Sequence, residues 1–274
     1  MTTFTERRIA HVTLTLLAAA VIIALVAWGE PTARDAAYTS GWVLMGLMVF
    51  LTIYNLRKKM PYPPLFSSAA WLQLHVYIGW LTIPVYLLHT AVRLPTGPMD
   101  ITLAALFVLL IASGIFGLLI SRSAPRRMTV RGQEVIFERI PMIRRQLRQR
   151  VEQVVLEAVK ETDTTTLSAF YRDRLADFFS RPRHMKRHLL QWTGPRQRLL
   201  REVASLRRYL DDREQAAADE IEQLIEDKDA LDYHHAMQWL LKAWLFVHLP
   251  LTYALMILAV VHAVLMHTFV GVIR

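Results

Sequence analysis

Five long apolar stretches constrain the fold of this chain more than any other feature. They cover about residues 9–28, 41–54, 71–92, 101–120 and 240–270. An α-helix needs about 20 apolar residues to cross the hydrocarbon core of a bilayer. The second stretch is shorter, but Trp42 and Tyr54 stand near its ends, where interfacial aromatic side chains are common. The sequence therefore predicts an all-α integral membrane bundle of five transmembrane helices.

The first stretch follows Arg7 and Arg8, a pattern that secretory signal peptides share. Its apolar run of about 20 residues is longer than the usual core of such a peptide. We therefore expect a retained transmembrane helix at this position.

Charged residues gather in a single segment of the chain. Residues 122–238 hold 23 of the 32 Lys and Arg residues and 19 of the 23 Asp and Glu residues. Apolar residues recur there at steps of three and four, which is typical of amphipathic helices. We predict about four helices within residues 121–239, the last of them long and continuous with the fifth span. The chain would then comprise spans one to four (1–120), a helical insertion (121–239) and the fifth span (240–274).

The basic residues also predict how the spans are oriented. They lie before span one, between spans two and three, and directly after span four: Arg7, Arg8, Arg57, Lys58, Lys59, Arg122, Arg126, Arg127 and Arg131. The connections on the opposite side hold only Arg34 and Arg93. By the positive-inside rule, the N-terminus and residues 121–239 are cytoplasmic and the C-terminus is external. We expect the plasma (inner) membrane.

Composition and motifs exclude several classes of protein. A net charge of +9 would suit nucleic acid, but the basic residues flank apolar spans and no nucleic-acid-binding motif is present. The absence of cysteine excludes disulfides, thiolate metal sites and the usual iron–sulfur ligation. The insertion has no P-loop, no GxGxxG and no triad signature, so we do not expect it to be an enzyme itself.

Two of the predicted spans each carry a pair of histidines fourteen residues apart: His75 with His89, and His248 with His262. A step of fourteen returns a helical side chain to within roughly 40° of its starting face and advances it about 21 Å. Spans three and five run in the same direction in the predicted topology. His75 and His248 would then lie at one depth, and His89 and His262 at another.

Two facing imidazole pairs at two depths are what two bis-histidine haems require, because each porphyrin supplies four further nitrogen ligands. Zinc would need more protein ligands, and spans three and five contain no Asp, Glu or Cys. We predict one haem b bound by His75 and His248 near the cytoplasmic side, and a second bound by His89 and His262 near the external side. A histidine-lined proton or metal path and hydrogen-bonded structural histidines are the alternatives.

Small and basic residues near these histidines fit a porphyrin. Gly79 lies one turn after His75, and Gly114 and Gly117 lie in the fourth span. Small residues there would admit either a flat macrocycle or a closely packed helix. Arg93, one turn after His89, would either pair with a haem propionate or anchor the span at the interface.

The remaining histidines are not expected to bind haem. His267 is about 140° around the helix from His262 and cannot replace it on the same face. His184 and His188 have helical spacing, but the arginines and lysine around them would repel a cation. His234 and His235 precede the fifth span, where we expect a solvated helix start.

Spans two to five resemble the di-haem four-helix core of the cytochrome b and b6 superfamily, in which two histidines on one helix face two on another. The resemblance covers about half of the chain and rests on His75, His89, His248 and His262. The chain differs in its extra leading span and lacks the PEWY-type quinol motif and a pair of glycines fourteen residues apart. Transmembrane ferric reductases and NADPH oxidases share the histidine geometry, but no flavin or nicotinamide domain is recognised here.

These features predict a di-haem b-type cytochrome that carries electrons across the membrane, as the electron-transfer subunit of an oxidoreductase complex. The expected partners are lipid, a redox subunit that docks on the insertion or on the external haem face, and a quinone or another acceptor. No nucleic acid is expected. The rival interpretations are a proton or metal transporter and a non-redox scaffold that binds a partner through the cytoplasmic helices.

Overall fold

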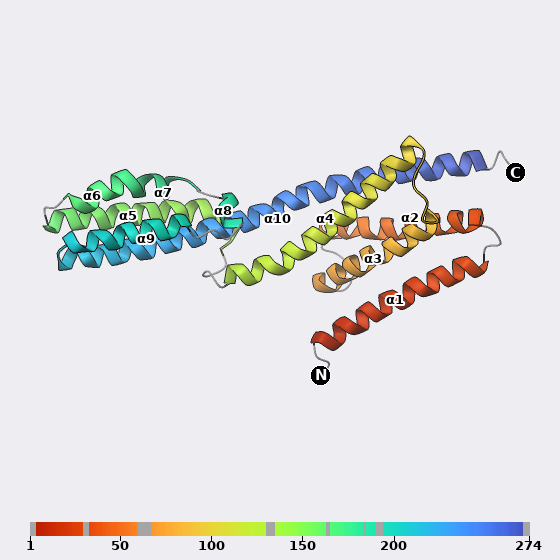
Figure 1. Ribbon diagram of the computed structural model, residues 1–274, viewed down its shortest axis with the longest axis horizontal. Helices are drawn as coiled ribbons and strands as arrows, with labels where there is room; N and C mark the ends of the chain where they lie inside the picture. The colour runs from red at the N-terminus through yellow and green to blue at the C-terminus, as the bar shows by residue number, and fades with distance from the viewer. Residues whose placement is uncertain are drawn as a thin grey trace. The chain divides into compact units, whose positions relative to one another are not determined.

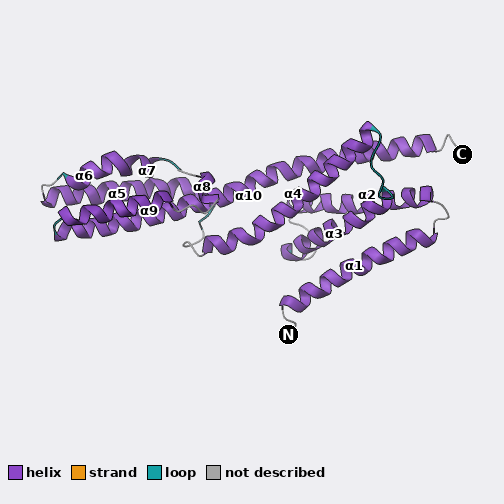
Figure 2. Cartoon of the chain, viewed as in Figure 1, coloured by secondary structure: helices purple, strands orange, loops and turns teal. Residues whose placement is uncertain are grey.

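The computed structural model describes residues 4–29, 33–59, 67–129, 135–162, 165–182, 185–189 and 194–270. Within these ranges every regular element is a helix, and no strand occurs (Figure 2). The predicted all-α class is therefore confirmed. The chain forms two compact units: the apolar unit, Met1–Phe116 with Phe246–Arg274, and the insertion unit, Gly117–Leu245.

The apolar unit is built from long helices, labelled in Figure 1. They are α1 (Phe4–Gly29), α2 (Ala33–Lys59), α3 (Ser68–His89), the first part of α4 (Pro98–Thr129) and the last part of α10 (Asp212–Val270). Among the described residues, four helices are long and apolar enough to cross a membrane, with segments at Ala36–Tyr54, Ser68–His89, Pro98–Pro125 and within Asp212–Thr268. The apolar segment of α1, Val12–Val26, is shorter than these. Four of the five predicted spans are therefore supported by length and composition.

The core of the apolar unit joins four helices. Leu44 and Met48 of α2, Val85 of α3, Phe107 of α4 and Leu255 of α10 are buried together. α3 also packs against both α1 and α2. These helices carry apolar side chains on all of their faces. Many of these side chains point away from the core and are exposed, which is typical of helices in a lipid environment.

The C-terminal end of α3 has an unusual backbone. The Val92 N–H donates to the Leu87 carbonyl and the Ala91 N–H donates to the Leu88 carbonyl, each at 3.1 Å. This is the Schellman pattern of helix termination, which favours glycine in the left-handed position. Here Ala91 and Val92 take φ values of 47° and 57°. The strained end fixes where α3 stops, directly after His89.

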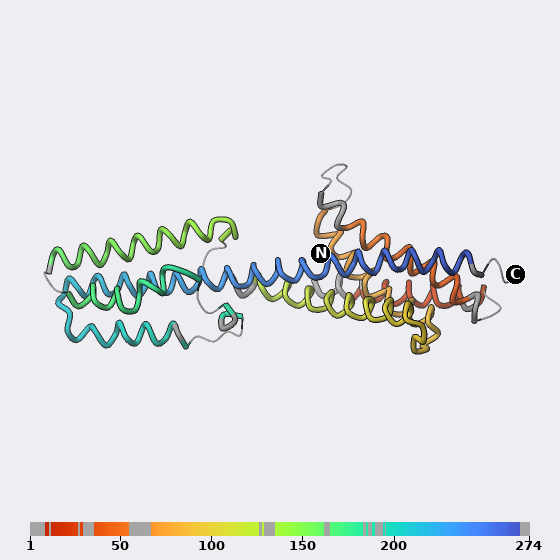
Figure 3. Tube along the Cα trace, turned by 90° about the horizontal axis from the view of Figure 1, so that it is seen from above, coloured from red at the N-terminus to blue at the C-terminus, as the bar shows by residue number. Residues whose placement is uncertain are grey.

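The insertion unit is a bundle of shorter helices around the first part of α10. It contains η1 (Phe137–Arg139), α5 (Ile140–Thr162), α6 (Thr166–Phe170), the π-helical turn η2 (Tyr171–Leu175), α7 (Ala176–Ser180), α8 (Met185–Leu189), α9 (Gly194–Leu206) and η3 (Arg207–Tyr209). α5, α9 and the first part of α10 lie side by side (Figure 3). Its main core includes Val151, Leu175, Phe179, Val203 and Ile225. The expected long last helix is confirmed, because α10 runs for 59 residues without interruption.

A buried charged cluster crosses the insertion unit. The Lys228 side chain is fully buried, pairs with Asp232, and donates to the Arg181 carbonyl at 3.0 Å. Its ammonium also lies 4.6 Å from the centre of the Phe178 ring. Arg144 approaches Asp232 at 3.7 Å. Burial lowers the pKa of Lys228, and Asp232 opposes that effect by favouring the charged form.

Candidate functional site

His89 of α3 and His262 of α10 lie next to each other in the apolar unit. Their ring centres are 6.3 Å apart, and the ring planes are perpendicular, with an interplanar angle of 90°. Two imidazoles that bind opposite sides of one metal ion, at about 2 Å each, place their ring centres roughly 6 Å apart. The separation is therefore compatible with one ion between the two rings.

The His89 ring is oriented by α2. Its Nδ1 lies 2.7 Å from the carbonyl oxygen of Ala37. Because a carbonyl can only accept, Nδ1 must carry the hydrogen, which leaves the Nε2 lone pair for a ligand. A Cβ at Gly41 would lie 2.9 Å from His89 Cε1, so the helix approaches the ring too closely for any side chain at that position. Two residues of α2 therefore set the tautomer and the position of this histidine.

His262 has a charged neighbour. Its Nδ1 lies 3.9 Å from Oδ1 of Asp100, in the first turn of α4. The histidine side chain is 27% exposed and the carboxylate 52%. The approach is longer than a direct hydrogen bond, but it places an anion behind the imidazole.

His248 of α10 has its own partner. Its Nδ1 lies 3.2 Å from Oγ of Ser113 on α4. A Cβ at Gly114, the next residue of that helix, would lie 3.9 Å from His248 Cε1. The small residues of α4 therefore admit this imidazole.

His75 of α3 contacts an aromatic ring of α2. The rings of Tyr54 and His75 have centres 4.9 Å apart and planes at 38°. His75 thus contacts Tyr54, and His248 contacts Ser113. Their pairing around a second metal stays a prediction.

The other residues expected near the haems divide into three cases. Gly79 has open space where a side chain would project, which suits a macrocycle close to α3. Gly117 serves helix packing instead, since a Cβ there would collide with the Trp244 indole within the insertion unit. Arg93 is exposed in the connection between α3 and α4.

The histidines outside the two pairs fall elsewhere. His267 is exposed near the end of α10, and His184 lies outside the described residues. His188 is buried, with its Nε2 3.9 Å from Oδ1 of Asp229. The expectation of a solvated helix start at His234 is wrong: its side chain is 1% exposed, because α10 is already a packed helix there. Burial also lowers the pKa of its neighbour His235.

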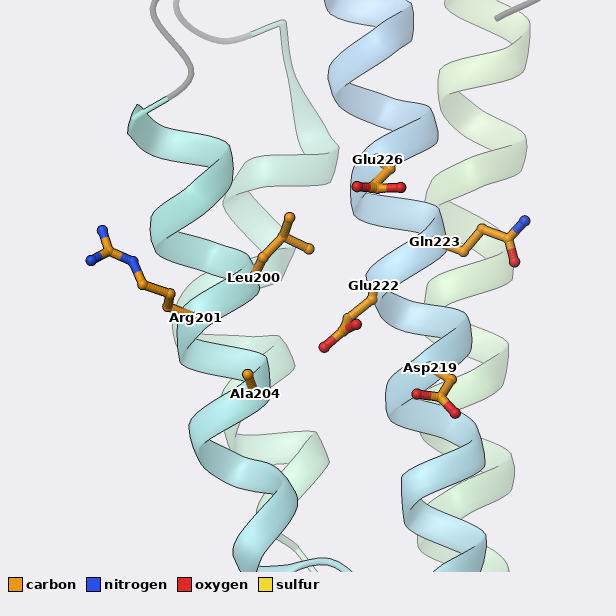
Figure 4. Close-up of a pocket in the computed structure, with 7 residues that line it drawn as sticks. All are labelled: Leu200, Arg201, Ala204, Asp219, Glu222, Gln223 and Glu226. Atoms are coloured by element: carbon orange, nitrogen blue, oxygen red, sulfur yellow. The ribbon is translucent and has the colours of Figure 1, made fainter. Parts of the chain in front are cut away.

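A second candidate is an open groove of about 570 Å³ in the insertion unit. It lies between α9 and α10 and is lined by Leu200, Arg201, Ala204, Asp219, Glu222, Gln223 and Glu226 (Figure 4). Figure 4 shows Glu222 turned toward α9, whereas the guanidinium of Arg201 points away from α10. Arg207 pairs with Asp219 and Glu222, and Arg196 pairs with Glu226. The three carboxylates of the groove are therefore paired with arginines of the insertion unit, and their presence does not require a bound ligand.

Sequence reasoning did not identify Ala37, Gly41 or Asp100 as neighbours of the histidines. Gly41 carries a weak signal, because glycine is costly in the interior of a helix and is kept where another group comes close. A backbone carbonyl such as that of Ala37 leaves no signal in the sequence. Within the described ranges, no group of three or more His, Cys, Asp or Glu side chains could hold a metal ion. A metal ion held by either histidine pair would therefore need its remaining ligands from another source.

Comparison of the chain with protein-family models, curated proteins and solved structures found no match.

Proposed function

We propose that this protein is a di-haem b-type cytochrome that carries electrons across a membrane. The observation that supports this most directly is the His89–His262 pair, with ring centres 6.3 Å apart on two different apolar helices. A lone histidine on a membrane helix has several uses, but two imidazoles at this separation would be able to hold one haem iron. His75 and His248 would bind the second haem.

The residues around the pair fit such a group. The Nδ1 atom of His89 faces the Ala37 carbonyl, which leaves its Nε2 for iron, and Nδ1 of His248 lies 3.2 Å from the Ser113 hydroxyl. Metal-binding histidines generally use the second ring nitrogen in this way, which fixes the ring orientation and makes the ligand more basic. The open space at Gly79 would accept part of a macrocycle. Arg93 would pair with a propionate.

A bound haem supplies a one-electron couple, between ferric and ferrous iron. The chain contributes the rest. Histidine remains a ligand in both oxidation states, and the apolar helices exclude water from the ligand nitrogens. The Ala37 carbonyl and the Ser113 hydroxyl hold the imidazoles in one orientation, so that little needs to move when the charge changes.

The proposed topology has five spans, with α1 as the first. The N-terminus and residues 121–239 are cytoplasmic, the C-terminus is external, and the membrane is the plasma (inner) membrane, as the basic residues indicate. The His75–His248 haem then lies near the cytoplasm and the His89–His262 haem near the exterior. A redox subunit docks on the insertion or on the external haem face. A quinone or another acceptor exchanges electrons at the other end of the path.

The test is a reduced-minus-oxidised absorption spectrum of the purified protein, with haem quantified per chain. We expect two b-type components. His89→Ala and His262→Ala should each remove the same component, while His75→Ala and His248→Ala should remove the other. His267→Ala is the matched control and should retain both.

Three outcomes would overturn the proposal. A colourless protein with normal folding favours the scaffold. A colourless protein that moves protons or metal ions in vesicles favours the transporter. Loss of a haem in His267→Ala, with both retained in His262→Ala, would show that the ligand was assigned to the wrong residue.

A further inference from the structure

We infer that Asp100 is a positioning residue for His262 and holds the adjacent haem at a lower reduction potential than a neutral neighbour would. The inference rests on the proposed function and names how one of its two haems is tuned. Asp100 is the only acidic residue between positions 36 and 133, and none follows Asp232. Asp100 is therefore the only acidic residue within α3, α4 and the part of α10 that belongs to the apolar unit.

The fold holds Asp100 at this place. It lies in the first turn of α4, where the N-terminal end of a helix favours a carboxylate. The Ile101 N–H donates to the Gly97 carbonyl at 2.9 Å, and this hydrogen bond begins the helix just before Asp100. The strained end of α3 after His89 sets the other end of the same connection. His89 and Asp100 therefore flank one short loop, and both face His262.

The Nδ1 neighbours of three histidines differ in charge. His89 faces a backbone carbonyl at 2.7 Å and His248 faces a hydroxyl at 3.2 Å, both neutral. His262 faces a carboxylate, that of Asp100, at 3.9 Å. An anion behind Nδ1–H makes the imidazole a stronger donor and favours ferric over ferrous iron. Since the carboxylate is half exposed, solvent screens part of this effect, and we expect a moderate shift.

The experiment is a redox titration of the holoprotein, followed by its visible spectrum. In Asp100→Asn one of the two components should shift by about tenfold in its ferric-to-ferrous ratio, about 59 mV upward for a one-electron couple. The other component should not move, and Asp100→Glu should restore the original value. Ser113→Ala, which alters the neighbour of His248, should affect only the second component.

Thr102→Ala is the matched control, because Thr102 is an exposed residue in the same part of α4 and its hydroxyl donates to the Pro98 carbonyl. It should leave both potentials unchanged. Two components whose potentials do not respond to Asp100→Asn would overturn the inference and leave the proposed function standing. A wild-type protein without haem would overturn the proposed function itself. If Asp100→Asn and Thr102→Ala lose the same haem, the effect belongs to the start of α4 and the inference fails.

Discussion

The two units of the molecule use polar residues in opposite ways. In the insertion unit, charged residues form many ion pairs, most of them exposed, such as Arg148 with Glu152 and Arg150 with Glu220. In the apolar unit, most hydrogen bonds from polar side chains run to a carbonyl of the same helix, as from Thr52 to Met48, while Ser113 and Asp100 lie beside histidines. Exposed pairs contribute little to stability, whereas a polar group in an apolar bundle is costly to keep. Polar side chains of the apolar unit thus mostly bond within their own helix, and Ser113 and Asp100 are two that reach another helix.

The largest expected effect concerns Gly41. In Gly41→Val the new Cβ would lie 2.9 Å from His89 Cε1, so the ring or α2 must move. We expect complete loss of the b-type component that His89 binds. Gly46→Val is the matched control on the same helix, because nothing lies within 4 Å of its Cβ position. The visible spectrum and the haem content decide; equal spectra for the two variants would contradict the close contact.

The next effect tests the insertion unit. Asp232→Asn removes the charge that pairs with the buried Lys228 and leaves an uncompensated cation inside the bundle. The expected loss is about 3–5 kcal/mol of the free energy of unfolding. Denaturant unfolding of the full-length protein, followed by circular dichroism, measures it.

A double variant separates charge from packing at this cluster. Lys228→Met with Asp232→Leu replaces both partners by apolar side chains and should recover most of the stability. If it is as unstable as Asp232→Asn, the cluster contributes through its shape and the explanation by charge is wrong.

A smaller effect is expected at the end of α3. Ala91 holds a φ of 47°, a left-handed conformation that costs an L-residue about 1–2 kcal/mol and glycine much less. Ala91→Gly should therefore raise the thermal stability of the apolar unit modestly. Both haem components should persist, since His89 itself is unchanged. A lower melting temperature would argue against the strained helix end.

The smallest effect is confined to high pH. Burial, together with the hydrogen bond that its hydroxyl donates to Glu152 at 2.7 Å, raises the pKa of Tyr171 to about 12. The contribution of Tyr171 to the free energy of unfolding is fully present below pH 10, the approximate pKa of tyrosine in the unfolded chain, because the phenol is then neutral in both states. It is lost as the pH rises from about 10 to 12, where the unfolded chain ionises first. Unfolding measured against pH should show this loss, and Tyr171→Phe should lack it.

Several parts of the fold followed from local patterns. The apolar runs predicted α2, α3 and α4, because length and hydropathy are properties of a continuous segment. The amphipathic repeats predicted a helical insertion and the long α10. The first span was less secure, since the apolar segment of α1 reaches only from Val12 to Val26. The burial of His234 was missed, because the packing partners of α10 are distant in sequence.

The sequence by itself determined which imidazoles share a helix face, because helical geometry fixes the side chains fourteen residues apart on one span. It therefore determined that His75 and His89 share one helix face, and that His248 and His262 share another. Together with the predicted topology it also placed His89 opposite His262, whose rings do lie next to each other. Only the tertiary structure decided that Gly41 and the Ala37 carbonyl orient the ring of His89, and that Asp100 lies beside the ring of His262. The physical reason is that helix packing, and not spacing along one chain, brings these atoms together.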